Sequence, residues 1–208
     1  MNAPRRPTES HARDMDASPF ARILTQLLSR VPGAFAAALV DAEGETVDYA
    51  GQTDPFDIKV AAAELRLLLQ HASPAVGEAA RSITVRGARR SLLIRALPDG
   101  YALTVLFRRG AGFTRSTRAY IACEHDLAAE ANWSAPPSAR WFAVQVRQDA
   151  RGRPATITTE NASADVEILG LIMNIGPYVR GYRVRTTAGA ELMLVREPGH
   201  AWYVDHSI

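Results

Sequence analysis

Lysine is almost absent from the sequence. Of its 24 basic residues, Lys59 is the only lysine and the rest are arginines. A Walker-type phosphate loop needs a lysine that reaches the phosphates, and no glycine-rich loop precedes Lys59. Schiff-base catalysis also needs a lysine. Both enzyme classes are therefore disfavoured, while the preference for arginine over lysine is typical of a GC-rich coding genome.

Cysteine and long apolar runs are scarce as well. Cys123 is the only cysteine, which excludes an internal disulfide and favours a reducing, cytoplasmic setting. No apolar run approaches ~18 residues, so we expect no transmembrane helix. No apolar stretch follows the first arginines, so we expect no secretory signal. The 208 residues, 47% hydrophobic and 22% charged, predict one or two ordinary globular domains.

Side chains suited to metal binding or catalysis are dispersed. The histidines are His11, His71, His125, His200 and His206. They form no known ligand spacing with cysteines or carboxylates, and the sequence has no GxSxG nucleophile motif. Cys123 and His125 are two residues apart on a predicted helix and point away from each other, so Cys123 is assigned to an apolar stripe. We therefore expect no catalytic residues, no metal and no cofactor.

Turn and cap signals divide the first 133 residues into a regular series of elements. A disordered arm is expected over 1–17, followed by a helix from Ser18-Pro19 to Val31-Pro32-Gly33. The further elements are strands 34–40 and 46–50, a helix over 56–72 ended by Pro74, strands 82–86, 92–96 and 101–107, and a helix over 113–132 starting near Thr114.

The remaining residues form a second pattern. The segment 134–139 contains two consecutive prolines and is interpreted as a linker. Residues 140–208 are predicted to form a small α+β module. Its expected elements are strands 141–147 and 155–159, a helix over 165–174, and strands 182–187, 191–196 and 202–205.

The helix over 56–72 has two apolar faces. The broad face carries Ile58, Ala61, Ala62, Leu65, Leu68, Leu69 and Ala72. A narrower strip on roughly the opposite side carries Val60, Ala63 and Leu67. A helix that lies on its own sheet needs one apolar face, so another protein or a neighbouring element of the chain is expected to cover the strip. The candidate partner interface is Lys59, Val60, Ala63, Glu64, Leu67 and His71.

Basic residues are concentrated in one stretch of the chain. Between Arg81 and Arg118 there are nine arginines and a single acid, Asp99. The candidate basic patch is Arg86, Arg89, Arg90, Arg108 and Arg109. Such a patch attracts acidic protein, anionic lipid or phosphate, although a solvated face is the more common explanation. Nucleic acid is less favoured, because the net charge is only +2 and few aromatic residues are available for stacking.

The ordered motifs of residues 18–133 resemble the Roadblock/dynein light chain family, in particular the MglB-like bacterial regulators of Ras-like small GTPases. The resemblance is carried by the amphipathic helix ending in Val31-Pro32-Gly33, by Asp41-Ala42-Glu43-Gly44-Glu45, by Tyr49-Ala50-Gly51, by the alanine-rich helix around 59–69, and by Leu97-Pro98-Asp99-Gly100-Tyr101. Residues from about 140 onward lie outside the resemblance.

The resemblance implies an α+β fold with the order α-β-β-α-β-β-β-α, in which helices cover both faces of a five-stranded antiparallel sheet. It also implies a cytoplasmic homodimer whose sheets or second helices pair. Such a protein is a non-enzymatic scaffold or regulator that binds a Ras-like small GTPase and modulates its GTP hydrolysis. The extra C-terminal module and the basic stretch depart from the family pattern.

Two other functions remain open from the sequence. One is a ligand-sensing or signalling adaptor domain, which needs a cavity with convergent polar groups. The other is a dimerisation domain that presents the C-terminal module as the binding part.

Overall fold

The computed structural model describes residues 14, 16–76, 79–111, 116–173, 175–176 and 178–206. Most of the arm expected over 1–17, and the candidate cap Thr114, lie outside the described residues. The chain divides into two compact units, each described by itself below. The sheet unit is Met1–Thr25 with Ala34–Arg109, and the barrel unit is Gln26–Gly33 with Gly110–Ile208.

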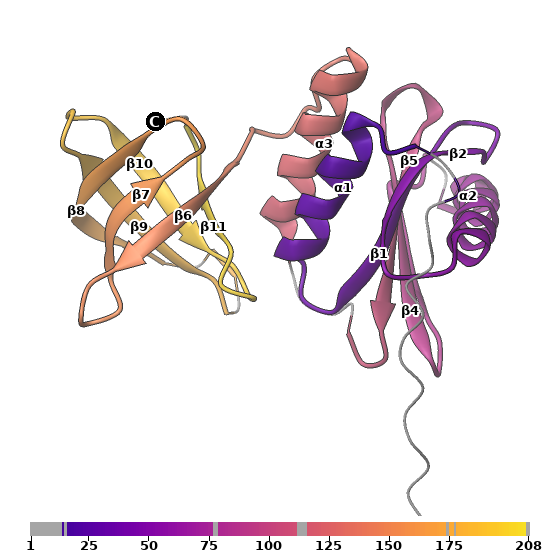
Figure 1. Ribbon diagram of the computed structural model, residues 1–208, viewed down its shortest axis with the longest axis horizontal. Helices are drawn as coiled ribbons and strands as arrows, with labels where there is room; N and C mark the ends of the chain where they lie inside the picture. The colour runs from indigo at the N-terminus through magenta and orange to yellow at the C-terminus, as the bar shows by residue number, and fades with distance from the viewer. Residues whose placement is uncertain are drawn as a thin grey trace, which may run out of the picture. The chain divides into compact units, whose positions relative to one another are not determined.

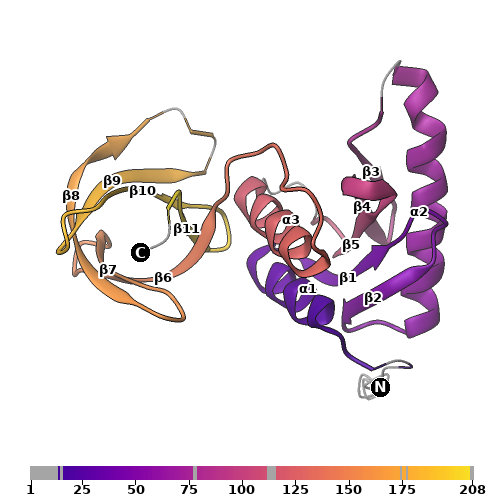
Figure 2. The same ribbon diagram turned by 90° about the horizontal axis from the view of Figure 1, so that it is seen from above.

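The sheet unit (Figure 1) is built on five antiparallel strands in the order β2-β1-β5-β4-β3, as Figure 2 shows. Its elements are the start of α1 (Pro19–Arg30), β1 (Ala34–Val40), β2 (Thr46–Gly51), α2 (Pro55–Val76), β3 (Ser82–Arg86), β4 (Arg90–Ala96), a 3₁₀ turn (Pro98–Gly100) and β5 (Ala102–Arg108). The strands and helices occur in the predicted order, and the α+β prediction for this part of the chain is confirmed.

Helix α2 covers one face of the sheet (Figure 2). On β1, Ala36, Ala38 and Val40 point to this face and pack with Ile58 and Leu65 of α2 in one buried cluster. The small alanine side chains let the helix backbone approach the strand closely. The alternate residues of β1 and β5 are buried as well, so the central strands are covered on both faces.

A buried carboxylate joins the start of α1 to β2. Asp48 is fully buried, and its Oδ2 accepts hydrogen bonds from the Ser18 backbone N–H (3.0 Å), the Ser18 hydroxyl (2.5 Å) and the Ala21 N–H (3.1 Å). The Ser18 hydroxyl in turn accepts a bond from the Phe20 N–H at 3.1 Å. Ser18 therefore caps the helix as predicted, and Asp48 satisfies backbone donors that the first turn leaves unpaired.

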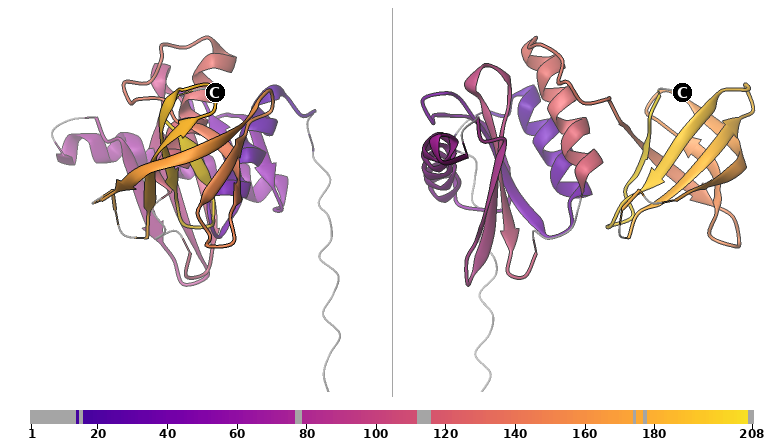
Figure 3. Two further views of the ribbon diagram at one scale, coloured as in Figure 1. Left: turned by 90° about the vertical axis from the view of Figure 1, so that its left-hand side faces the viewer. Right: turned by 180° about the vertical axis from the view of Figure 1, so that it is seen from behind.

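The barrel unit contains the end of α1, helix α3 (Thr117–Ala131) and six strands that form a closed barrel in the order β10-β11-β6-β7-β8-β9 (Figure 3). The strands are β6 (Phe142–Gln148), β7 (Pro154–Thr158), β8 (Ser163–Ile172), β9 (Arg180–Thr186), β10 (Glu191–Arg196) and β11 (Trp202–Val204). Inward side chains fill the interior, with Ile157, Val184 and Leu194 completely buried.

The helix expected over 165–174 is wrong, because this segment is strand β8 between β7 and β9. A β-bulge between Ile168 and Gly170 breaks the two-residue alternation of the strand. Apolar residues then recur at a spacing that is also compatible with a helix, and only pairing with both neighbours decides for the strand. The C-terminal strands accordingly form a barrel instead of the expected small α+β module.

Two helix boundaries also differ from the prediction. Helix α2 continues through Pro74 to Val76, so Pro74 does not end it. Proline removes a single backbone donor, and here that loss falls within the exposed last turn of the helix. Helix α3 begins at Thr117, with Ser116 at the cap position, and not at 113. Within the described residues, no helix combines the length and apolarity needed to cross a membrane.

Candidate functional site

The outer face of α2 presents apolar side chains to solvent. Val60 is 43% exposed, Leu67 49% and Phe56 72%, whereas Ile58 and Leu65 on the inner face are buried. Ala63 is half-buried. Single exposed leucines are ordinary, but these residues follow each other along one line of the helix. The structure thus places the predicted strip Val60, Ala63 and Leu67 on the outside of the sheet unit.

A groove of about 280 Å³ runs between α2 and the strands β3 and β4. Its apolar lining includes Phe56, Val60 and Leu68 from the helix, and Val85 and Leu92 from the strands. The expected burial of Leu68 on the broad helix face is wrong, because the side chain is 47% exposed at the groove. Among the described residues β3 is the last strand on this side of the sheet, so no further strand covers Leu68.

Phe56 was missed as a member of the site. It is the second residue of α2, and because Asp54 and Pro55 precede it, the sequence indicated only that a helix starts here. Its position four residues before Val60 is the signal that could have identified it, because residues four apart share a helix face. Phe56 is the most exposed large apolar residue of the groove.

Charged residues of both signs border the same groove. Asp57 and Glu64 line it from α2, and Arg90 lines it from β4. All three residues are exposed. The groove therefore has an acidic side on the helix and a basic side on the strand, with apolar residues between them.

Strand β3 forms one edge of the sheet and has a strand neighbour only on the β4 side among the described residues. Its side chains alternate between exposed and half-buried, with Ile83 and Val85 on the half-buried side. The outer edge of such a strand carries backbone N–H and C=O groups that can pair with another strand. This edge lies next to the groove, because Val85 belongs to both.

Lys59 lies away from the groove, on the side of α2 that faces the N-terminal segment. Its Nζ is 2.7 Å from Asp14 Oδ2 and 5.9 Å from the centre of the Tyr49 ring. The hydrogen bond from Lys59, followed by that from the Tyr49 hydroxyl, lowers the pKa of Asp14. Glu64 and His71 of the predicted interface are exposed. The structure thus brings Val60, Ala63, Glu64 and Leu67 to one surface and gives Lys59 a partner within the chain.

The residues of the candidate basic patch gather at one end of the sheet. The turn between β3 and β4 closes with a hydrogen bond from the Gly87 N–H to the Arg90 carbonyl at 3.0 Å, which places Arg86 and Arg89 beside Arg90. Arg90 lies directly opposite Arg108 of β5, and Arg109 follows. Within the described residues, no carboxylate forms an ion pair with Arg89, Arg90, Arg108 or Arg109.

The other candidate residues offer no metal centre. No group of three or more His, Cys, Asp or Glu side chains in the described part of the chain is arranged to hold a metal ion. Cys123 is buried in α3, which agrees with its assignment to the apolar stripe.

Comparison with solved structures shows that about half of the chain is similar to Roadblock domains. The solved structures that are similar include a Roadblock/LC7 domain from Streptomyces avermitilis, with 21% identity over 52% of this chain and 88% of that chain and a TM-score of 0.41. The gliding protein MglB from Thermus thermophilus has 20% identity, coverages of 54% and 88% and a TM-score of 0.46. MglB from Myxococcus xanthus has 20% identity, coverages of 57% and 93% and a TM-score of 0.45.

No protein-family model matches the sequence, and no curated protein matches it either. The structural similarity covers about half of the chain, and the remaining part is unmatched.

Proposed function

We propose that the protein is a dimeric scaffold of the Roadblock type that binds a Ras-like small GTPase. The order of motifs in residues 18–133 supports the class, and the single observation that carries the proposal is the apolar outer face of α2 beside an open sheet edge. An apolar face of this kind is stabilised when a partner removes it from water.

The partner on the α2 face is a second copy of the chain. A two-fold dimer brings the same surface together twice, so the surface must complement itself. The groove meets this condition, because it carries Asp57 and Glu64 on one side and Arg90 on the other. The exposed edge of β3 adds backbone donors and acceptors that a second β3 can pair with in the antiparallel direction.

Apart from Arg90, which lines the groove, the residues of the basic patch then attract an acidic partner. Arg89, Arg108 and Arg109 are exposed and have no carboxylate partner among the described residues, so their field extends into solvent. We assign to this patch a role in the approach of the GTPase. The chain acts as a scaffold, cytoplasmic and without catalytic residues of its own.

The test of the dimer is the mass of the full chain in solution, measured by light scattering during gel filtration. The unmodified chain is expected to be a dimer, and Val60→Arg and Leu67→Glu are expected to be monomers. Leu171→Glu is the matched control, because Leu171 is an exposed leucine of the barrel unit at 69% exposure. A monomeric unmodified chain, or an equal loss of dimer in the control, would contradict the proposal.

The test of the GTPase is a separate measurement. The tagged chain is used to capture proteins from its source in the presence of GDP or a non-hydrolysable GTP analogue, and a captured Ras-like GTPase is then purified and titrated with the chain. Binding is expected to depend on the nucleotide and to weaken when Arg108 and Arg109 are changed to glutamate. If no nucleotide-dependent GTPase binds while the dimer persists, the scaffold has another partner.

A further inference from the structure

One end of the barrel carries two arginines that face each other across neighbouring strands. Arg180 of β9 is directly opposite Arg196 of β10, and Arg196 is opposite Trp202 of β11. Directly opposite residues share a face of the sheet, and Trp202 belongs to the buried interior. Both arginines therefore lie on the inward side, at the point where the barrel ends.

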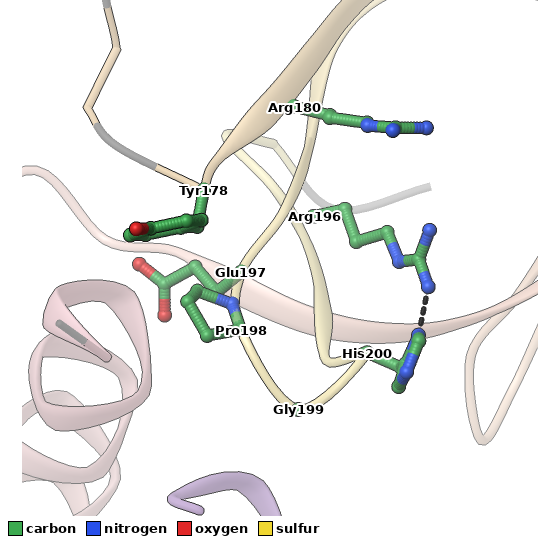
Figure 4. Close-up of a pocket in the computed structure, with 7 residues that line it drawn as sticks. All are labelled: Tyr178, Arg180, Arg196, Glu197, Pro198, Gly199 and His200. Carbon is green, nitrogen blue, oxygen red and sulfur yellow. Dashed lines mark hydrogen bonds between the residues drawn. The ribbon is translucent and has the colours of Figure 1, made fainter. Parts of the chain in front are cut away.

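These arginines line a pocket of about 260 Å³ together with His200 and Tyr178. Figure 4 shows the Arg180 and Arg196 side chains extending in the same direction, with the His200 ring beside the end of Arg196. The Arg196 guanidinium also lies 5.7 Å from the centre of the Trp202 ring. The aromatic ring thus orients one of the two guanidinium groups.

The two arginines have no acidic partner in the part of the chain that the structure describes. In the described residues no carboxylate lies within ion-pair distance of Arg180 or Arg196. Glu197 lines the pocket, but its Oε1 accepts hydrogen bonds from the backbone N–H (3.0 Å) and guanidinium (3.3 Å) of Arg118. In Figure 4 its carboxylate points away from Arg180 and Arg196.

The outer face of the same two strands provides the contrast. There Arg183 and Arg185 of β9 also lie close together, but Glu191 accepts a hydrogen bond from each of them, at 2.9 and 2.8 Å. Like charges directly opposite each other in a sheet repel, and Arg180 and Arg196 are such a pair. On the outer face, Arg183 and Arg185 are two residues apart on one strand, and the Glu191 carboxylate offsets their repulsion. At the barrel end that negative charge is missing from the described residues.

The polar groups on this side of the pocket are hydrogen-bond donors. Each guanidinium offers several N–H groups in a planar fork, which matches the oxygens of a phosphate. Arg196 also donates a hydrogen bond to Nδ1 of His200. Tyr178 and His200 also hold left-handed backbone conformations, with φ of 63° and 67°, which non-glycine residues adopt at a cost.

We propose that this end of the barrel is a binding site for a phosphate monoester, held by the guanidinium groups of Arg180 and Arg196. The bound dianion supplies the charge that Glu191 supplies on the outer face. The phosphate can belong to a soluble ester or to a lipid headgroup, since the same donors recognise both. The site shares no residue with the α2 face or the β3 edge of the proposed dimer.

The first experiment uses phenyl phosphate and the full-length chain at constant ionic strength. Saturable binding is expected by calorimetry, with shifts of the Arg180 and Arg196 Nε–Hε signals in NMR spectra. Arg180→Gln and Arg196→Gln are each expected to weaken binding by about tenfold or more, as lost bonds to a charged group imply. Arg183→Gln, a substitution in the paired outer arginines, is the matched control and is expected to bind normally.

The second arm identifies the source of the phosphate. Vesicles of phosphatidylcholine with and without phosphatidic acid are compared with phenyl phosphate in solution, and retention by the acidic vesicles, sensitive to Arg180→Gln, assigns the site to a headgroup. Binding of the soluble ester without retention assigns it to a small molecule or a modified side chain. If chloride produces the same effect as phosphate, or Arg183→Gln weakens binding equally, the proposal is overturned.

A measurement of thermal stability tests the proposal even if a variant does not bind phosphate. Without phosphate at low salt, Arg180→Gln is expected to raise the Tm, because it removes the repulsion between the two arginines. With phenyl phosphate the order is expected to reverse, because the unmodified chain binds the ligand more tightly and gains more stability from it. A lower Tm for Arg180→Gln in the absence of phosphate contradicts the proposal.

Discussion

The sheet unit and the barrel unit differ in whether they have exposed strand edges. The sheet ends at β2 and β3, while the six strands of the barrel close on themselves and leave no edge. Next to the β3 edge, α2 exposes Phe56, Val60 and Leu67. The open unit therefore has a surface that gains from a partner, whereas the closed unit completes its backbone pairing alone.

The two units also differ in where they place unpaired positive charge. In the sheet unit Arg89, Arg108 and Arg109 project from the outside of one end of the sheet. In the barrel unit the outer arginines of β9 are neutralised by Glu191, and the unpaired ones stand at the barrel end. The first arrangement suits the attraction of a large acidic partner, and the second suits the enclosure of a small anion.

The largest effect is expected from the interior of the closed unit. Leu194→Ala removes a fully buried side chain from the barrel and should lower the free energy of unfolding by about 2–5 kcal/mol. All three tryptophans, Trp133, Trp141 and Trp202, belong to this unit, so their fluorescence during urea unfolding reports the change. Leu171→Ala, at an exposed position, should cost no more than about 0.5 kcal/mol. An equal loss of unfolding free energy in the two variants would contradict the packed interior of the barrel.

A somewhat smaller effect is expected at the joint between α1 and β2 in the sheet unit. Asp48→Ala leaves the Ser18 and Ala21 N–H groups without their buried acceptor and should cost at least about 2 kcal/mol. Asp54→Ala is the matched control, because Asp54 Oδ1 accepts the Phe56 N–H in a bond exposed to solvent; its loss should cost about 1 kcal/mol. Urea unfolding followed by circular dichroism measures both. A larger cost at Asp54 would contradict the role of burial.

The next prediction concerns the pH dependence of the barrel unit through Glu197. Burial raises the pKa of Glu197 above its ordinary value of 4.5, and the bonds from Arg118 only partly oppose the shift. As the pH rises from 4.5 toward this raised pKa, the unfolded state loses its proton first, so the stability contribution of the protonated carboxyl is lost. The urea midpoint of unfolding should therefore fall between acidic and neutral pH, and Glu197→Gln should make this fall smaller. A fall of unchanged slope in the variant would refute the assignment.

The smallest effect is expected from Glu191 on the outer face of the barrel. Its effect on stability depends on pH in the opposite direction to that of Glu197. Hydrogen bonds from Arg185, and then from Arg183, lower the pKa of Glu191. Its stabilising contribution is present above the ordinary value and is lost as the pH falls through the lowered pKa. Because the group is fully exposed, Glu191→Gln should change the unfolding midpoint only slightly, and less in high salt. Carboxyl NMR titration should show the pKa rising in Arg185→Gln.

Much of the sheet unit could be predicted from the sequence. The prediction was successful where local signals agreed, as at the cap Ser18, the strand Ala34–Val40 and the turn before Thr46. It failed at Pro74, because helix ends depend on a few exposed hydrogen bonds. It also failed at the start of α3 in the barrel unit, where the Arg118 N–H donates to Glu197, a buried residue 79 positions further along the chain.

The barrel was predicted less well, because its decisive contacts are not local. The bulge in β8 interrupts the two-residue alternation typical of a strand, and only the pairing with β7 and β9 excludes a helix. The pocket at the barrel end joins residues of the 178–180 and 196–200 segments. His200 is one of the dispersed histidines of the sequence, and only the structure places it beside Arg196.

The sequence by itself determined the order of elements up to α3, the second apolar strip of α2 and the concentration of arginine between Arg81 and Arg118. These properties follow from periodicity and composition, which are local. Only the tertiary structure decided that Phe56 and Leu68 share a groove with β3 and β4, that the C-terminal strands close into a barrel, and that Arg180 faces Arg196. The reason is that strand order and register depend on backbone pairing between distant segments, and side-chain spacing alone does not specify that pairing.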